Sequence, residues 1–135
     1  MRVIVTGPRD WTDTNIVQIA FDDVWELAEN SNPFPQVLIV HGGADGLDKL
    51  CEAEAWRREW QTQELRPKYG IYPPKIAPLK RNQEMVDIGA DLALVFLMPC
   101  EKKNCRRKGM HFTHGTSDCL DRIKAADMWH WKYYA

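Results

Sequence analysis

A glycine-rich turn with the sequence HGGADGLD spans residues 41 to 48 and follows the apolar run VLIV. A short run of this kind is typical of a buried parallel strand, and the residues after the turn have the spacing of a helix. Glycine lets the backbone approach a bound group closely, and the first N–H groups of a helix point at whatever lies before them. The turn is therefore a candidate site for an anion, most often a phosphate. It could also serve only to connect a strand to a helix.

A second turn of this type, GPRDW at residues 7 to 11, follows the β-branched run RVIVT. An open α/β sheet places its ligand at the carboxyl ends of such strands. Arg9 could bind a phosphate or a carboxylate through a forked contact, or it could face solvent and pair with Asp10. Two turns that carry glycine, arginine and aspartate favour a ligand site over simple connections.

Soft metal ligands gather in the segment from Met98 to His114, MPCEKKNCRRKGMHFTH. Sulfur and imidazole are the ligands that zinc prefers, and four of them complete a tetrahedral site. The five candidates are Cys100, Cys105, His111, His114 and Cys119. Their spacing is close to the pattern of zinc fingers but outside it, and such residues in a basic loop need not bind a metal. A structural zinc ion would order this loop beside the ligand crevice.

The same segment is basic, with five cations at Lys102, Lys103, Arg106, Arg107 and Lys108. A compact basic cluster could bind the phosphates of a nucleotide or of a nucleic-acid strand. It could also be a solvated loop.

Alternating strands and helices must position these residues. Strands are predicted at 2–6, 36–40, 62–66 and 91–97, and helices at 13–29, from 45 or 46 to 60, 79–89 and 115–127. The helical spacing turns Met85 and Ile88 inward and places Leu47, Leu50, Ala53, Trp56 and Trp60 on one helix face. Residues 67–78 contain four prolines and predict a loop, and long loops in compact domains are often functional. We expect an α/β fold, a Rossmann-like three-layer sandwich with a mainly parallel sheet in a single domain.

Composition limits the class of protein. The 135 residues carry a net charge of −1, which argues against a general nucleic-acid coat. No apolar run is long enough to span a membrane, and Met1-Arg2 leads directly into the first predicted strand without a signal peptide. We therefore expect a cytoplasmic protein with reduced cysteines and no membrane partner.

Four motifs stand in a fixed order: VTGPRDW at 5–11, HGGADGLD at 41–48, RNQEMV at 81–86 and GTSD at 115–118. This order resembles the SLOG superfamily, which contains the DNA-processing protein Smf/DprA and the lonely-guy phosphoribohydrolases, and above all its small stand-alone YspA-like branch. The resemblance covers residues 1–126, which we expect to form a SLOG-like nucleotide-binding domain with 98–114 as a Cys/His-rich basic insertion. Residues 127–135 are expected to form an aromatic C-terminal tail.

The resemblance implies a nucleotide or a nucleotide-derived phosphorylated ligand, which the protein senses or sequesters, and no other organic cofactor. The matching positions are Gly7, Arg9, Gly42, Gly43, Asp45, Asp48, Arg81, Met85, Gly115 and Thr116. Asp10 lies in the first turn, and Asn82 and Asp118 could hold a ribose hydroxyl or a base. The N–H groups at Gly115 and the hydroxyl of Thr116 suit a phosphate, and the guanidinium of Arg81 could complete the anion site.

One departure from the resemblance bears on catalysis. The phosphoribohydrolases use a motif arginine together with a glutamate three residues after the threonine, and that position is Cys119 here. Cleavage of an N-glycosidic bond needs a nearby carboxylate, which a neutral thiol cannot supply. Arg81 and Asp118 are the candidate catalytic pair if the chain is a nucleotide N-glycosidase. We favour binding, with the phosphoribohydrolase as one alternative and a single-stranded DNA-binding module as another.

Aromatic residues crowd the end of the chain at Trp129, Trp131, Tyr133 and Tyr134. They could stack on bases. They could equally pack onto the domain or form a homo-oligomer contact.

Overall fold

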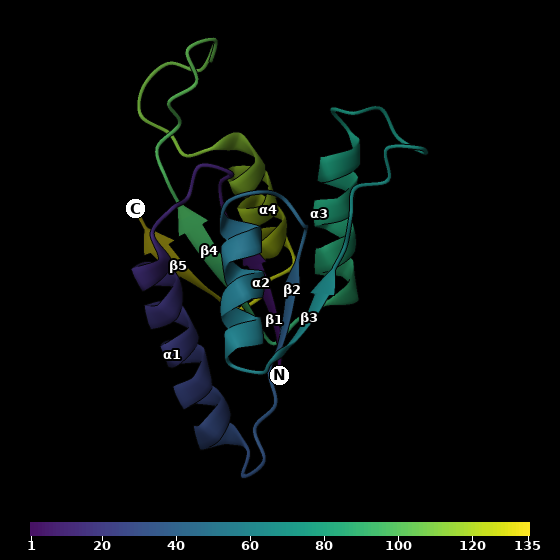
Figure 1. Ribbon diagram of the computed structural model, residues 1–135. Coiled ribbons are helices and arrows are strands. Elements are labelled where there is room, and N and C mark those ends of the chain that lie inside the picture. Colours follow the sequence, from purple (N-terminus) through teal and green to yellow (C-terminus); the bar gives the residue numbers. More distant parts are fainter.

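A single five-stranded sheet runs through the computed structural model, which describes all of residues 1–135. The strand order is β3-β2-β1-β4-β5, and every pairing is parallel. The strands are β1 (Arg2–Thr6), β2 (Leu38–His41), β3 (Gln61–Glu64), β4 (Leu92–Leu97) and β5 (His130–Tyr134). The sheet is labelled in Figure 1.

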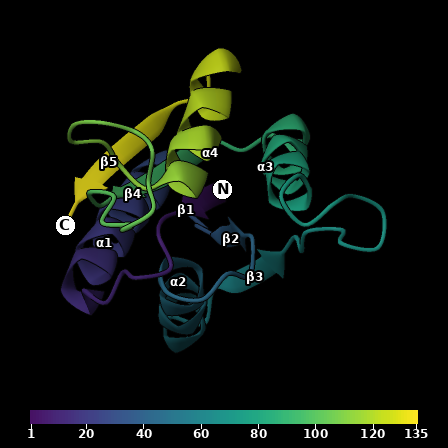
Figure 2. The same cartoon turned by 90° about the horizontal axis from the view of Figure 1, so that it is seen from above.

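Four helices cover the two faces of the sheet. They are α1 (Thr14–Ser31), α2 (Leu47–Arg57), α3 (Ala77–Ile88) and α4 (His114–Ala125). Seen from above in Figure 2, α1 and α2 lie on one side of the sheet and α3 and α4 on the other. This arrangement confirms the predicted α/β three-layer sandwich and the single domain, with a sheet that is wholly parallel.

Alternating residues of the strands build a separate apolar core on each face. In β1, Val3 and Val5 belong to the core beneath α1 and α2, whereas Ile4 belongs to the core beneath α3 and α4. All six residues of β4 are buried, because helices cover this strand on both sides. Because both faces of β4 are buried, its sequence is a continuous apolar run and does not alternate with polar residues.

The order of the strands fixes where a crevice opens. The chain leaves β1 for β2 on one side, and it later returns to pair β4 with the other side of β1. Connections that run in opposite directions from neighbouring strands leave a gap above their carboxyl ends. The turn after β1, the turn after β2 and the segment after β4 all lie at this edge.

Some local predictions were wrong in detail. Ile88 is 51% exposed at the last position of α3, and Trp56 is 60% exposed on α2. Leu47 is buried on α2 as predicted, but it shares the buried face with Cys51 and Ala55, and the indole of Trp56 donates to the hydroxyl of Thr62 across 3.0 Å. Helical spacing indicated that each helix has an apolar face, but it did not determine which residues of α2 and α3 contact the sheet.

The predicted aromatic tail is an edge strand of the sheet. Residues of β5 pair in register with β4, from His130 opposite Ala93 to Tyr134 opposite Leu97. Tyr133 stacks on Phe96 with ring centroids 5.2 Å apart, and its hydroxyl donates to Asp23 on α1. Trp131 and Tyr133 therefore pack against the core of the domain, whereas Trp129 and Tyr134 are exposed.

Two irregular segments stand above the carboxyl edge of the sheet in Figure 1. One connects β3 to α3 and contains the prolines of residues 67–78. The other connects β4 to α4, and its ends are joined by an antiparallel bridge between Pro99 and Phe112. None of the helices has the length and the apolar character that crossing a membrane requires.

Candidate functional site

The turn between β2 and α2 is organised around a buried carboxylate. Asp48 Oδ2 accepts hydrogen bonds from the backbone N–H groups of Gly42 and Ala44, each 3.2 Å long. Burial raises the pKa of Asp48, and the N–H of Ala44 and the charge of Arg81 oppose this rise. Asp48 thus shapes the turn from beneath, and its carboxylate is occupied by the backbone of the turn.

Arg81 reaches this turn from the other face of the sheet. Its Nη1 donates to the carbonyl oxygen of Gly42 across 2.7 Å, and its Nε donates to Asn82 Oδ1 across 3.0 Å. A side chain at residue 42 would collide with the guanidinium, so only glycine allows this approach. Gly43 follows with a φ of +74°, which also favours glycine. The two glycines are required by the packing of the turn itself.

His41 is a site residue that the sequence interpretation did not single out, although it opens the glycine motif. Its side chain is fully buried, and Nδ1 accepts a hydrogen bond of 3.0 Å from the N–H of Gly43. The ring proton must then lie on Nε2, which is 2.8 Å from Glu52 Oε2. His41 therefore connects the turn to α2.

A pocket of about 450 Å³ opens in front of the turn. Gly42, Gly43 and Asp45 line it together with Arg9 and Arg81, so five predicted ligand-binding residues meet here. The lining of the pocket contains four cationic side chains, two carboxylates and one exposed aromatic ring, that of Tyr69. The further lining residues are Ala44, Lys49, Glu64, Arg66, Pro67, Tyr69 and Pro78.

Some charged side chains of this pocket form ion pairs within the protein, and others do not. Lys49 lies 3.1 Å from Glu64, and Arg66 pairs with the same carboxylate, which lowers the pKa of Glu64. Arg9 is exposed, and its guanidinium forms no hydrogen bond or ion pair. Arg81 keeps Nη2 unengaged. An incoming anion would therefore find Arg9 and one edge of Arg81 available.

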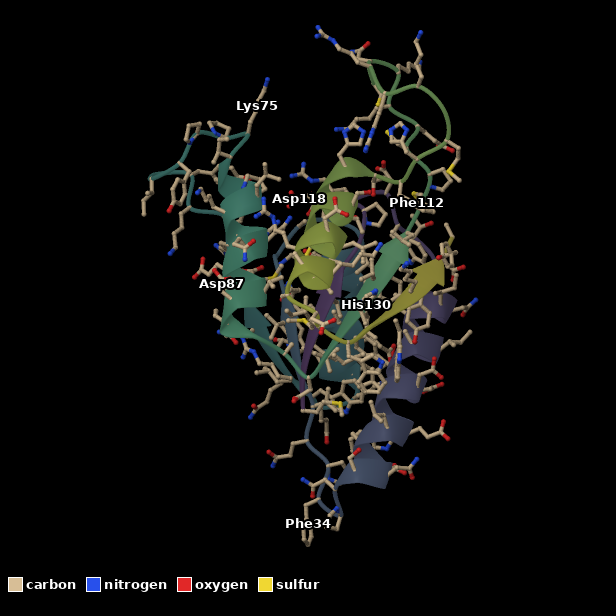
Figure 3. The ribbon with its side chains drawn as sticks, turned by 180° about the vertical axis from the view of Figure 1, so that it is seen from behind. Phe34, Lys75, Asp87, Phe112, Asp118 and His130 are labelled. Atoms are coloured by element: carbon tan, nitrogen blue, oxygen red, sulfur yellow. The ribbon has the colours of Figure 1, made fainter.

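Asn82 joins Arg81 to the beginning of α4. Its Nδ2 lies 3.0 Å from Asp118 Oδ2 and 3.5 Å from the carbonyl oxygen of Gly115. Asp118 is also held by both nitrogens of a forked contact from Arg122, at 2.9 and 3.2 Å. Figure 3 places Asp118 on the side of α4 that faces α3. The carboxylate is therefore engaged by two neighbours and does not line the pocket.

Thr116 and Cys119 are buried residues of α4 that do not line the pocket. Thr116 is buried, and its Oγ1 lies 3.2 Å from the hydroxyl of Thr113, which donates to it. Cys119 is fully buried in the core beneath α3 and α4. Burial raises the pKa of its thiol to about 11, against smaller opposing effects of Thr6 and Arg81.

Seven of the twelve predicted ligand-binding residues lie outside the pocket: Asp48, Asn82, Gly115 and Thr116, and also Met85, Gly7 and Asp10. Met85 is 2% exposed in the core, and Gly7 packs against Leu47 and Phe96, where a larger residue would clash. Asp10 is exposed and does not line the pocket. Met85 and Gly7 therefore have packing roles, and Asp10 is a surface residue outside the pocket.

Four of the five predicted metal ligands converge in the segment between β4 and α4. Cys105 Sγ lies 3.3 Å from His111 Nε2 and 3.4 Å from His114 Nε2. Cys100 Sγ lies 3.7 Å from His114 Nε2, and the two Nε2 atoms are 3.1 Å apart. We call these four residues the Cys/His cluster, which has the donor atoms and the spacing to hold a metal ion. The fifth candidate, Cys119, lies in the core and is excluded from the cluster.

The basic residues of the same segment face solvent. All five cations between 102 and 108 are exposed, and none of them lies within 4.0 Å of a carboxylate. Glu101 is the one acidic residue in the segment. This basic loop, residues 102–108, therefore has no intramolecular charge partner.

Comparison with known proteins places this geometry in a family. The family described as "YAcAr: YspA, cpYpsA-related SLOG family" matches residues 1–70, which contain both glycine turns. The "Gene 61 protein" of Mycobacterium phage D29 is 38% identical over 99 residues, covering 70% of this chain and 75% of that protein. No solved structure matches the chain. On these grounds the chain belongs to the YspA, cpYpsA-related SLOG family.

Proposed function

We propose that this protein binds a nucleotide or a nucleotide-derived phosphorylated ligand in the pocket at the carboxyl ends of β1 and β2, as a sensor or a sequestering protein. The observation that carries the proposal is the pocket in which Gly42 and Gly43 meet the guanidinium groups of Arg9 and Arg81. Backbone at a glycine turn and arginine side chains are the groups that recognise phosphate. Membership of the SLOG family supports a nucleotide-related ligand.

The rest of the pocket suits the other parts of a nucleotide. Tyr69 lines the pocket and is exposed, so its ring offers a face on which a base can stack. Asp45 is exposed at the rim and can accept hydrogen bonds from ribose hydroxyl groups. A volume of about 450 Å³ is within the range of small-molecule sites.

The test is a calorimetric titration of the purified protein with nucleoside monophosphates. Arg9→Ala is expected to lower the affinity about tenfold, because it removes an unpaired guanidinium from the pocket. Lys124→Ala is the matched control, since Lys124 is exposed and unpaired on α4 and lies outside the pocket. Equal affinities of the two variants would contradict the proposed site.

Hydrolysis of the ligand is the alternative that the same crevice allows. The forked contact from Arg122 and the neutral thiol at Cys119 favour binding, because neither leaves a free carboxylate at the expected position. If the protein is instead a phosphoribohydrolase, Asp118→Ala abolishes the release of base and ribose phosphate. Unchanged product formation in that variant would remove the assignment of Asp118.

We also propose that the Cys/His cluster holds a zinc ion. Two thiols and two imidazoles form a donor set that suits zinc. Magnesium and calcium take oxygen ligands instead. The expected result is one zinc ion per chain in protein purified without chelators. A metal content near zero would contradict the proposal.

Binding to single-stranded DNA is a second candidate function. The basic loop favours it, because five exposed cations have no acidic partner within the chain. Counterion release predicts an affinity that falls steeply with salt concentration. A chain in which all five cations are replaced by serine should lose this binding, and an absence of binding by the unaltered protein at low salt would exclude the function.

A further inference from the structure

We infer that a zinc ion in the Cys/His cluster fixes the first turn of α4 and thereby raises the affinity of the crevice for its phosphorylated ligand. This inference rests on the nucleotide binding proposed above. It assigns a task to a metal site that lies outside the ligand pocket, and it is carried by the geometry of the cluster and by its position in the chain.

Four of the six separations between the donor atoms of the cluster are close to those of a tetrahedral zinc site. Bonds of about 2.3 Å to sulfur and about 2.0 Å to nitrogen place neighbouring ligands about 3.3–3.8 Å apart around one ion. Three sulfur–nitrogen distances in the cluster are 3.3, 3.4 and 3.7 Å, and the nitrogen–nitrogen distance is 3.1 Å. All four donor atoms lie within 4.8 Å of one another. An ion at their centre requires only small movements.

The orientation of one histidine ring also favours a metal. His111 Nδ1 lies 2.9 Å from the carbonyl oxygen of Gly109, so that Nδ1 donates its proton there. The lone pair of Nε2 then faces the cluster, which is the arrangement that carbonyl groups impose on metal-binding histidines.

The segment around the cluster has no apolar core of its own, and only Met98 and Phe112 near its ends pack against the cores of the domain. Every residue from 98 to 115 is exposed or only partly buried. Its ends are held by the bridge at Pro99 and by two backbone hydrogen bonds, from Cys100 N–H to the carbonyl of His111 and from Thr113 N–H to that of Met98. A metal ion that joins both halves would supply the missing stabilisation.

The cluster is connected directly to α4, because its ligand His114 is the first residue of that helix. The N–H groups in the first turn of a helix have no partner within the helix, so they are available to an anion. Helix ends fray when they are not held. Zinc on His114 holds the position of Gly115 and Thr116, where those N–H groups are.

A short chain of contacts leads from this turn to the pocket. The carbonyl of Gly115 faces Asn82 Nδ2, Asn82 Oδ1 accepts from Arg81, and Arg81 binds the carbonyl of Gly42. Order at the start of α4 therefore supports the guanidinium that faces the ligand. Because coupling between two sites is reciprocal, ligand binding must raise the affinity for zinc by the same factor.

The experiment compares zinc-loaded protein, zinc-free protein, His111→Ala and His130→Ala. His130→Ala is the matched control, because His130 is the first residue of β5 and belongs neither to the cluster nor to the pocket, and Figure 3 shows it away from the segment that carries Phe112 and the cluster. Zinc content, amide hydrogen exchange of residues 98–117 and the affinity for adenosine 5′-monophosphate are measured for each. We expect loss of zinc to speed exchange in this segment and to weaken nucleotide binding about tenfold, in His111→Ala but not in His130→Ala.

The three measurements separate the ways in which the inference can fail. Absence of zinc from the unaltered protein would overturn it at the metal site. Equal nucleotide affinity with and without zinc would overturn the coupling and leave both sites standing. No nucleotide binding by the zinc-loaded protein would contradict the proposed function itself, and the coupling with it.

Discussion

Arg81 on α3 donates a hydrogen bond of 2.7 Å to the carbonyl oxygen of Gly42, so a helix on one face of the sheet holds the turn that precedes a helix on the other. The same guanidinium faces the pocket. Arg81 can therefore stabilise the turn and contact a ligand at the same time. Substitutions can distinguish its effect on stability from its effect on ligand affinity.

Replacement of Arg81 by alanine is expected to lower both stability and ligand affinity. The loss of charged hydrogen bonds to Gly42 and Asn82 should cost about 1–2 kcal/mol in the free energy of unfolding. Arg81→Lys keeps the charge but lacks the planar guanidinium that reaches Gly42 and Asn82 with separate nitrogens, so its effect on stability should be similar. Urea unfolding with a parallel nucleotide titration measures both effects. Arg9→Ala should lower the affinity alone, and a stability loss as large as that of Arg81→Ala would contradict this division.

A methyl group at residue 42 should disrupt the turn. In Gly42→Ala, the new Cβ meets the guanidinium of Arg81, so either the arginine leaves its place or the turn shifts. We expect a lower melting temperature and weaker ligand binding. Gly70→Ala is the control, because a Cβ at residue 70 meets no atom within 4 Å. Equal melting temperatures for the two variants would show that Arg81 moves aside without penalty.

The buried carboxylate of Asp48 should give stability a measurable pH dependence. Its pKa is raised in the folded protein by burial, so the folded state holds the proton more tightly than the unfolded chain. This group therefore contributes stability below its ordinary pKa, and that contribution is lost as the pH rises through the raised pKa. In Asp48→Asn, the amide oxygen can still accept from Gly42 and Ala44, and nothing ionises.

The comparison of Asp48→Asn with the unaltered protein isolates this titration from those of other carboxyl groups. The variant should gain in relative stability as the pH is raised from acid to neutral, as measured by the urea midpoint at each pH. A constant difference across this range would contradict a raised pKa at Asp48.

Reactivity of the thiols should report on the metal site. Cys51 and Cys119 are fully buried with raised pKa values, whereas Cys100 and Cys105 are partly exposed. The nucleophile in disulfide exchange is the thiolate, so the two buried cysteines should react slowly in the folded protein. We expect two fast-reacting thiols per chain without zinc and none with zinc, followed with a chromogenic disulfide reagent. Fast reaction of Cys100 and Cys105 in zinc-loaded protein would argue against their coordination.

The glycine turns could be predicted because their requirements are local. A strand, two glycines and a helix pattern are contiguous in the sequence, and the structure places Gly42 and Gly43 in the pocket as that pattern indicated. The role of Arg81 could be predicted only in part. Its contact with Gly42 joins residues 39 positions apart, and no sequence spacing encodes that distance.

The metal ligands illustrate the same limit. Chemistry predicted five candidates, and their order along the chain could not decide among them. Cys119 is removed from the cluster because α4 turns it into the core, five residues after the helix begins at His114. Likewise Ile88 and Trp56 satisfied helical periodicity but stay exposed, because the direction of a helix face depends on the sheet that it covers.

The order of the strands leaves β3 and β5 at the two open edges of the sheet. β3 reads QTQE, without a single aliphatic side chain, and β5 carries Lys132 in its centre. Exposed strand edges recruit further strands when they are long, flat and apolar, and polar or charged residues oppose that growth. The polar composition of β3 therefore opposes the addition of further strands at this edge.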